Sequence, residues 1–333
     1  MEQQNSAVKQ AYLNEFKGNL FEFSVGSYLA RHYGLESQYL EELGPEFRKQ
    51  LKAYERLLRS KDPELLKRIP LLAREVTSQI CSHDRSVVKS IHLIGKVAGG
   101  KGHSSFGEGD IRIGCGESGE RLLSIKLCKK NSFVNTKSGG IKSFIENYFA
   151  TELALKLQAQ IADTLSSSFF QLGAEFYQYY GLEGWNGEFD SAWDELSLPT
   201  LPGNLPAPLK KLIKEHYHRV IKEVYNAFLA IYQNDPVCFK KALGPLCGFS
   251  LENVEQVCLF HSEDKSGRYL LSSIKNMNYL DFQNALASVS LAPLKPKLSS
   301  FEILLGEMRL QIRVKPMNKF TQMAMKVNCS VRF

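Results

Sequence analysis

The sequence lacks the features that mark membrane and secreted proteins. No apolar run approaches the roughly 20 residues that a membrane-spanning helix needs, and the N-terminus (Met-Glu-Gln-Gln-Asn-Ser) has no apolar signal core. The seven cysteines are odd in number and include no Cys-x-x-Cys pair, which argues against a disulfide framework and a structural zinc site. We therefore expect an intracellular protein of a reducing compartment, with no membrane partner.

Two common catalytic signatures are also missing. Gly95 to Lys101 has the Gly-x-x-x-x-Gly-Lys spacing of a phosphate-binding loop, but Gly102 replaces the Ser or Thr that binds magnesium, and no helix is expected to follow. No Gly-x-Ser-x-Gly elbow is present. His216 and His218 are two residues apart on an expected helix, so they point to different faces and make a poor metal pair. An NTPase is rejected, and a serine hydrolase has no local support.

Acidic residues are absent from two stretches of a chain whose formal net charge is +7. One stretch runs from Arg121 to Ile145 and the other follows Glu307, and both contain several lysines and arginines. Basic segments without acids attract polyanions because their charges are not neutralised within the segment. This distribution, more than the modest net charge, favours a nucleic-acid partner.

Hydrophobic periodicity and turn residues predict an α/β protein of one large or two moderate domains. Helices are expected at 6–33, 36–59, 63–70, 70–82, 141–166 and 210–232, and from Pro236 onward. Strands are expected at 90–95 and 257–261, with a polar, turn-rich segment at 129–140. Two tryptophans, five acids and three prolines gather between residues 177 and 206, which predicts an insertion or a domain junction there.

Two β-hairpins are the strongest local signals. One is C-terminal and pairs residues 308–314 with 324–333. In the other, Asp110 begins a short apolar run, and a glycine-rich turn joins it to a second run that contains Ser124 and Lys126. Because side chains repeat every second residue along a strand, Ser124 and Lys126 share one face. A carboxylate and a lysine that meet across such a hairpin can hold a divalent cation and stabilise a phosphoryl transition state.

Neighbouring residues support a site at the hairpin. Lys129, Lys130 and Asn131 follow Lys126 and suit phosphate groups. Glu22 lies on an apolar helix, where an acid costs free energy unless it is paired or bound to a metal. The simpler alternative is that Asp110 caps a turn and that Lys126 is a solvated strand lysine.

At these residues the chain resembles the PD-(D/E)XK nucleases, and among them the type II restriction endonucleases. The similarity consists of Lys17-Gly18 and Phe21-Glu22 on the first helix, Gly109-Asp110-Ile111, and Ser124-Ile125-Lys126, with further likeness at 131–144 and 313–318. It implies an α/β fold with a restriction-endonuclease-like mixed β-sheet core flanked by helices, with additional helical and C-terminal β-hairpin elements. It also implies a Mg²⁺ cofactor, a homodimer and a bacterial cytoplasmic location.

The resemblance implies a role for each residue of the site. Asp110 would bind Mg²⁺, and Lys126 would position the attacking water or stabilise the charge that develops on the phosphoryl group. Glu22 would match a first-helix glutamate that supports the metal site in some members. Ser124 replaces the family's second carboxylate, and a neutral serine cannot supply the charge that Mg²⁺ favours. Glu146 on the following helix is the candidate substitute.

The sequence thus predicts a Mg²⁺-dependent endodeoxyribonuclease that cuts double-stranded DNA at a specific sequence. Residues 1–180 would form the catalytic core, 181–206 an acidic, proline-rich insertion or junction, and 207–333 a helical segment and hairpin that complete the fold or contact DNA. The residues expected to contact DNA are Lys129, Lys130, Asn131, Asn135, Lys137, Lys142, Arg313, Lys315, Asn318 and Lys319. A non-catalytic DNA-binding protein of the same fold and a repair or junction-resolving nuclease stay open as alternatives.

Overall fold

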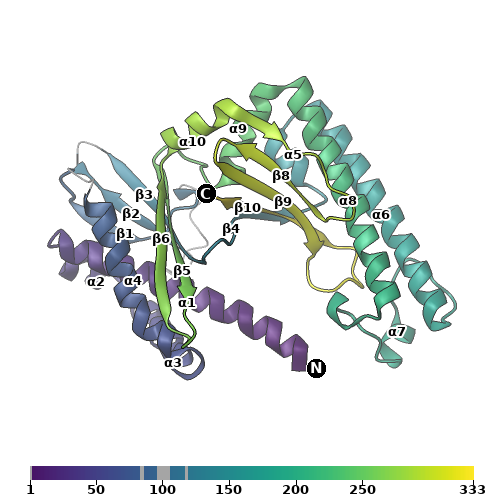
Figure 1. Ribbon diagram of the computed structural model, residues 1–333, viewed down its shortest axis with the longest axis horizontal. Coiled ribbons are helices and arrows are strands. Elements are labelled where there is room, and N and C mark those ends of the chain that lie inside the picture. Colours follow the sequence, from purple (N-terminus) through teal and green to yellow (C-terminus); the bar gives the residue numbers. More distant parts are fainter. Residues whose placement is uncertain (1, 83–85, 96–105, 117–118) are drawn as a thin grey trace. The chain divides into compact units, whose positions relative to one another are not determined.

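The chain separates into two units. A computed structural model describes residues 2–82, 86–95, 106–116 and 119–333, with side chains from residue 13 onward (Figure 1). The first unit comprises Met1–Val134 and Gly248–Asn284, and the second comprises Asn135–Cys247 and Ala285–Phe333. These units do not coincide with the predicted segments 1–180, 181–206 and 207–333. The stretch 96–105, which includes most of the rejected phosphate loop, lies outside the described residues.

The first unit packs helices on a mixed sheet. Its helices are α1 (Glu2–His32), α2 (Glu36–Glu42), α3 (Pro45–Lys61), α4 (Pro63–Ser82) and all but the last residue of α10 (Tyr279–Ala285). Its strands are β1 (Ser90–Leu93), β2 (Ile111–Gly114), β3 (Glu120–Lys129), β5 (Val254–Glu263) and β6 (Tyr269–Met277). They lie in the order β1-β2-β3-β5-β6, and the pairs are antiparallel except for the parallel pair β3–β5. The predicted central hairpin is therefore confirmed as β2–β3.

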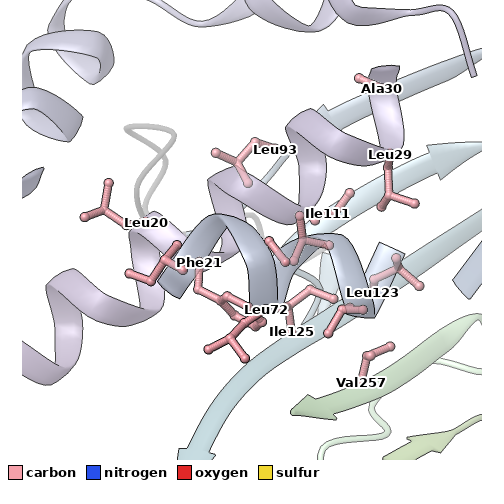
Figure 2. Close-up of a cluster of buried hydrophobic side chains, with 14 of the residues drawn as sticks. Leu20, Phe21, Leu29, Ala30, Leu72, Leu93, Ile111, Leu123, Ile125 and Val257 are labelled. Atoms are coloured by element: carbon pink, nitrogen blue, oxygen red, sulfur yellow. The ribbon is translucent and has the colours of Figure 1, made fainter. Parts of the chain in front are cut away.

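Buried aliphatic and aromatic side chains hold α1 and α4 against one face of this sheet (Figure 2). Leu123 and Ile125 of β3 are 0% and 1% exposed and contact a cluster that includes Phe21 of α1 and Leu72 of α4. Truncating such a core side chain to Ala typically costs 2–5 kcal/mol. Leu123 and Ile125, with Leu127, pack into this one cluster and so use one face of β3, which leaves the other face to Ser124.

Prolines divide the helices of this unit differently from the prediction. The single helix expected at 36–59 is wrong, because α2 ends at Glu42 and Gly44 is extended (ψ 156°) before Pro45 begins α3. A residue before proline is disfavoured in the helical region, which explains the break. The helix boundary expected at Pro70 is also wrong, because α4 continues through it. Burial of the apolar side of α4, with residues such as Leu72, offsets the one hydrogen bond that proline cannot donate.

The second unit joins helices to another sheet. Its helices are α5 (Phe144–Phe149), α6 (Glu152–Tyr180), α7 (Ser191–Glu195), α8 (Ala207–Asn234) and α9 (Pro236–Cys247), with 3₁₀ turns η4 (Pro202–Asn204) and η5 (Leu286–Ser288). Its strands are β4 (Val134–Gly140, with Val134 counted in the first unit), β7 (Val289–Leu291), β8 (Ser300–Leu305), β9 (Met308–Pro316) and β10 (Met325–Arg332). The order is β4-β10-β9-β8-β7. The predicted C-terminal hairpin is confirmed as β9–β10, and the chain as a whole is mixed α/β, as expected.

Two local predictions in this unit are wrong. The turn-rich segment expected at 129–140 contains β4, whose polar composition suits an edge strand with one side unpaired. The helix expected at 141–166 is two helices, because Ala150 adopts a left-handed conformation (φ 36°) and the Thr151 side chain caps α6 by accepting the Ala154 N–H at 3.1 Å. Buried Gln158 fixes the joint by accepting the N–H of Ile145 at 2.8 Å.

The composition change at 177–206 marks a packed aromatic region of the second unit. Trp193 is 1% exposed and contacts Phe176, Tyr177 and Phe320 in one cluster. Trp185 lies so close to α6 that a Cβ at Gly173 would be 2.0 Å from its ring. Glycine is therefore required at 173, and the segment is held by aromatic packing.

Candidate active site

Asp110 lies just before β2 and is held by both neighbouring strands. Its backbone N–H donates to the Leu123 carbonyl of β3 at 2.7 Å. Its own carbonyl accepts the N–H groups of Ile94 and Gly95, just beyond β1, at 2.9 and 3.1 Å. These bonds fix the position of the carboxylate at the point where the hairpin begins.

Lys126 contacts this carboxylate from β3. Its Nζ lies 2.8 Å from Asp110 Oδ2, an oxygen that also accepts the backbone N–H of Ile125 at 2.8 Å. The Lys126 side chain is 31% exposed. Its partial burial lowers its pKa, but Asp110 and then Glu22 outweigh that effect, so the pKa stays above its ordinary value. Lys126 is therefore a cation, which can donate hydrogen bonds but cannot serve as a general base.

Glu22 reaches the same place from α1. A Cβ at Gly95 would lie 3.3 Å from Glu22 Oε2 and 3.5 Å from Asp110 Oδ1. Both oxygens thus face one small volume, which the absence of a side chain at Gly95 leaves open. Asp110 Oδ1 is not the oxygen that Lys126 contacts. The structure therefore brings together Asp110, Lys126 and Glu22, three of the residues predicted from the sequence.

Ser124 lies one strand step from Lys126 but is closed to solvent, with 2% of its surface exposed. In register it pairs with Gln256 of β5, which is also buried, and Lys126 pairs with Cys258. Paired residues of adjacent strands point to the same face, so Gln256 shares the face of Ser124 and Lys126. The prediction missed Gln256 because it started the strand at Val257. Residues 254–260 (Val-Glu-Gln-Val-Cys-Leu-Phe) do not alternate in polarity, so no local pattern extended the strand to Gln256.

The oxygen donors at this place fit a hard divalent cation. Magnesium sites in proteins commonly use one or two carboxylates and complete the shell with waters and substrate phosphates. Asp110 and Glu22 supply two carboxylates beside the space at Gly95. In the described part of the chain, no group of three or more His, Cys, Asp or Glu side chains could hold a metal. The donor set therefore suits an ion shared with a phosphate better than a closed structural centre.

Some residues predicted to contact DNA lie at the end of β3, beyond Lys126. Lys129 ends the strand and pairs with Glu263 at 3.2 Å. Lys130 and Asn131 follow and are exposed. Asn131 has a φ of 62°, a left-handed conformation that asparagine tolerates better than most residues, and it lies in the turn that follows β3. These polar groups therefore lie at the end of the strand that carries Lys126.

The remaining predicted residues belong to the second unit. Glu146 lies on α5 of the second unit, whereas Asp110, Lys126 and Glu22 lie in the first. Its role as a metal ligand therefore stays a prediction. Asn135 accepts a hydrogen bond from Ser330 at 2.8 Å through its side-chain oxygen. Lys142 lines a pocket of about 570 Å³. The others are Lys137 on β4, Arg313 and Lys315 on β9, and Asn318 and Lys319 between β9 and β10.

Comparison with known proteins gave no match. No family model fits the chain, and neither the curated proteins nor the solved structures include a significantly similar one. The described residues include no helix with the length and apolar character to cross a membrane. A functional assignment therefore depends on the geometry of Asp110, Lys126 and Glu22.

Proposed function

We propose that this protein is a Mg²⁺-dependent endodeoxyribonuclease that hydrolyses phosphodiester bonds of double-stranded DNA, as type II restriction endonucleases do. One observation carries the proposal: Asp110, Lys126 and Glu22 converge from the start of β2, from β3 and from α1. Two carboxylates and a cationic lysine in one place suit phosphodiester hydrolysis, because the reaction adds negative charge to a group that is already anionic. The restriction-endonuclease-like core is part of this proposal.

Each residue has a separate part in the proposed reaction. Asp110 and Glu22 would hold Mg²⁺, which when bound supplies a Lewis acid and lowers the pKa of its water. Lys126 stabilises the charge that develops on the phosphoryl oxygens and can orient the attacking water by donating a hydrogen bond. Because the pKa of Lys126 is raised, the lysine keeps its proton, and the water's proton must pass to a phosphate oxygen or to solvent.

Ser124 and Glu146 have weaker parts in this proposal. Ser124 is buried beside Gln256, and its neutral hydroxyl supplies no charge. Glu22 then takes the place of the family's second carboxylate, and Glu146 is the alternative source. A homodimer would supply one such site for each DNA strand.

A second candidate function is DNA binding without cleavage. It is favoured by the neutral Ser124 and by the absence, among the described residues, of a third acid at the site. If two carboxylates bind Mg²⁺ too weakly, the basic residues would still bind DNA. A repair or junction-resolving nuclease would use the same site with a different choice of substrate.

The test is cleavage of supercoiled plasmid in Mg²⁺ and in EDTA by the wild type, Asp110→Asn and Lys126→Met. Matched controls are Asp163→Asn and Lys156→Met, which change exposed residues of α6. Discrete fragments from the wild type and the controls, but not from the site variants, would support a restriction-type nuclease. Salt-sensitive binding without cleavage in Mg²⁺ or Mn²⁺ would reject the nuclease in favour of the binding protein. Cuts confined to branched DNA would indicate a junction nuclease.

A further inference from the structure

The sheet of the second unit has one apolar and one basic face. Along β9, Leu310, Ile312 and Val314 are buried, and the residues between them are polar. The register places Asn328 of β10 opposite Arg313, and Lys326 opposite Lys315. Because side chains alternate between the faces of a sheet, the polar residues of both strands lie on the same side. Six of these residues are called the basic face: Arg309, Gln311, Arg313, Lys315, Lys326 and Asn328.

Among the residues that the structure describes, three cations of the basic face have no acidic partner. Arg309 pairs with Glu302 of β8 at 3.4 Å. In the described part of the chain, no carboxylate lies within ion-pair distance of Arg313, Lys315 or Lys326. Partial burial lowers the pKa of Lys315, and Lys326 and Arg313 lower it further. The three cations are thus close enough to repel one another.

Uncompensated like charge on paired strands costs stability, and an external anion would remove that cost. Alternate residues along one strand lie roughly 7 Å apart, so β9 presents Arg313 and Lys315 in one row, and Lys326 of β10 lies opposite Lys315. Duplex DNA carries regularly repeated charge, about one per 3.4 Å of axis on each strand. The amides of Gln311 and Asn328 add neutral donors of the kind that also bind phosphate oxygens.

We infer that the basic face binds the phosphate backbone of duplex DNA, with Arg313, Lys315 and Lys326 as the contacts. The choice of DNA rests on the proposed function, because the sheet itself specifies only a regular array of negative charge. The inference adds Lys326 and Asn328, which were not predicted. It also places the contact on the paired ends of β9 and β10 and gives no part to Asn318 and Lys319 of the connection between them.

The experiment measures binding of a short fluorescent DNA duplex by anisotropy over a series of salt concentrations, in EDTA so that no cleavage occurs. The face variant combines Arg313→Gln, Lys315→Gln and Lys326→Gln. A control variant removes the same charge from the exposed side of α8 in the same unit, with Lys210→Gln, Lys214→Gln and Lys222→Gln. A third variant, Asn318→Ala with Lys319→Gln, tests the connection. Fluorescence of Trp185 and Trp193 verifies that the second unit is folded in each.

For the face variant we expect the slope of log K against log salt to fall by about three, and the affinity near 0.1 M salt to fall on the order of a hundredfold. The α8 control and the connection variant should bind almost as the wild type does. Equal weakening of the face and α8 variants would overturn the inference, because only net charge would then matter. A greater loss for duplex RNA than for duplex DNA would overturn the choice of ligand.

The inference and the proposed nuclease can fail separately. If the wild type never cuts plasmid but the face variant alone loses DNA binding, the basic face stands and the nuclease is rejected. If the wild type cuts and the face variant retains the binding of the α8 control, the nuclease stands and the basic face is rejected.

Discussion

Two partly buried lysines, one in each unit, have opposite electrostatic surroundings. Burial disfavours the charged form of both Lys126 and Lys315. In the first unit, Asp110 and Glu22 reverse that effect and raise the pKa of Lys126. In the second, Lys326 and Arg313 add to it and lower the pKa of Lys315. The difference therefore comes from the neighbours of each lysine, since burial acts in the same direction on both.

The two lysines suit two different roles for a cation. Lys126 is balanced inside the protein, so its charge is held in place before any substrate arrives, which is the preorganisation that catalysis exploits. Lys315 is unbalanced, so it gains most from an anion that comes from outside. In the proposed nuclease, Lys126 would meet the reacting phosphate and Lys315 the phosphates that do not react.

The core of the second unit contains a buried histidine whose pKa is lowered, as that of Lys315 is. His216 of α8 is 4% exposed, and its Nδ1 lies 2.8 Å from the Ser168 hydroxyl. Burial, aided by nearby Arg219, lowers the pKa of His216 to about 4. The ring is therefore neutral at physiological pH.

The largest effect is expected from breaking the balanced pair. In Asp110→Asn, the amide can still accept the Ile125 N–H, but the charge that would bind Mg²⁺ and hold Lys126 is lost. Cleavage of plasmid should fall by about 10²–10³-fold or more, the range seen when one group that stabilises a transition state is removed. Binding of duplex DNA in EDTA should persist. Cleavage at the wild-type rate would instead exclude Asp110 from the reaction.

The next largest effect concerns the stability of the second unit in acid. Because the folded-state pKa of His216 is depressed, the unfolded chain takes up the proton first as the pH falls. Its contribution to stability is therefore complete above pH 6.5 and is lost as the pH falls towards 4. The free energy of unfolding should fall by about 3 kcal/mol over this window.

The chain's two tryptophans, Trp185 and Trp193, both lie in the second unit, so tryptophan fluorescence during urea unfolding reports on that unit. His216→Gln should flatten the dependence on pH between 6.5 and 4. His32→Gln, at an exposed position of α1, controls for the loss of a histidine elsewhere. An unchanged slope in His216→Gln would show that another group causes the acid sensitivity.

The sequence was most informative where the structure is local. The β2–β3 hairpin follows from alternation and glycines within about 20 residues, so the facing positions of Asp110 and Lys126 could be inferred without the fold. The β9–β10 hairpin follows for the same reason. An acid among apolar helix residues needs a partner, which points to Glu22. The approach of Glu22 to Asp110 depends on Gly95, whose only signal in the sequence is the spacing of a phosphate-binding loop.

Structure that depends on distant pairing was not predictable in this way. β4 pairs with β10, which is far away in the sequence, and its polar residues resemble a loop until that partner is known. β3 and β5 are parallel neighbours although a large part of the second unit lies between them in the chain. Local periodicity contains no information on which distant strands pair. The division into two units and the position of Gln256 beside Ser124 therefore could not be derived from the sequence.

Closing the space between the two carboxylates should have an intermediate effect. In Gly95→Ala, the new Cβ would lie 3.3 Å from Glu22 Oε2, which is tight but which a flexible carboxylate can relieve by moving. We expect a roughly tenfold loss of Mg²⁺-dependent cleavage, equal to about 1.4 kcal/mol, that higher Mg²⁺ partly restores. Gly203→Ala, where a Cβ meets nothing within 4 Å, is the control. A loss that Mg²⁺ does not restore would point to a folding defect.

The smallest expected effect tests whether removing the charge of Lys315 and removing that of Lys126 change stability in opposite directions. Lys315→Gln removes a repelled charge, so it should stabilise the second unit by a few tenths of a kcal/mol while it weakens DNA binding. Lys126→Met removes a balanced charge and should destabilise the first unit. The pKa of Lys315 is lowered in the folded state, so as the pH rises towards 10.5 the folded wild type loses this proton before the unfolded chain does. The stability of the wild type therefore rises with pH, and the stability gained by Lys315→Gln becomes smaller. Urea unfolding at pH 7 and pH 10 measures both. Destabilisation by Lys315→Gln at neutral pH would mean that the aliphatic stem of this lysine matters more than its charge, and the basic face would then be under no electrostatic strain for DNA to relieve.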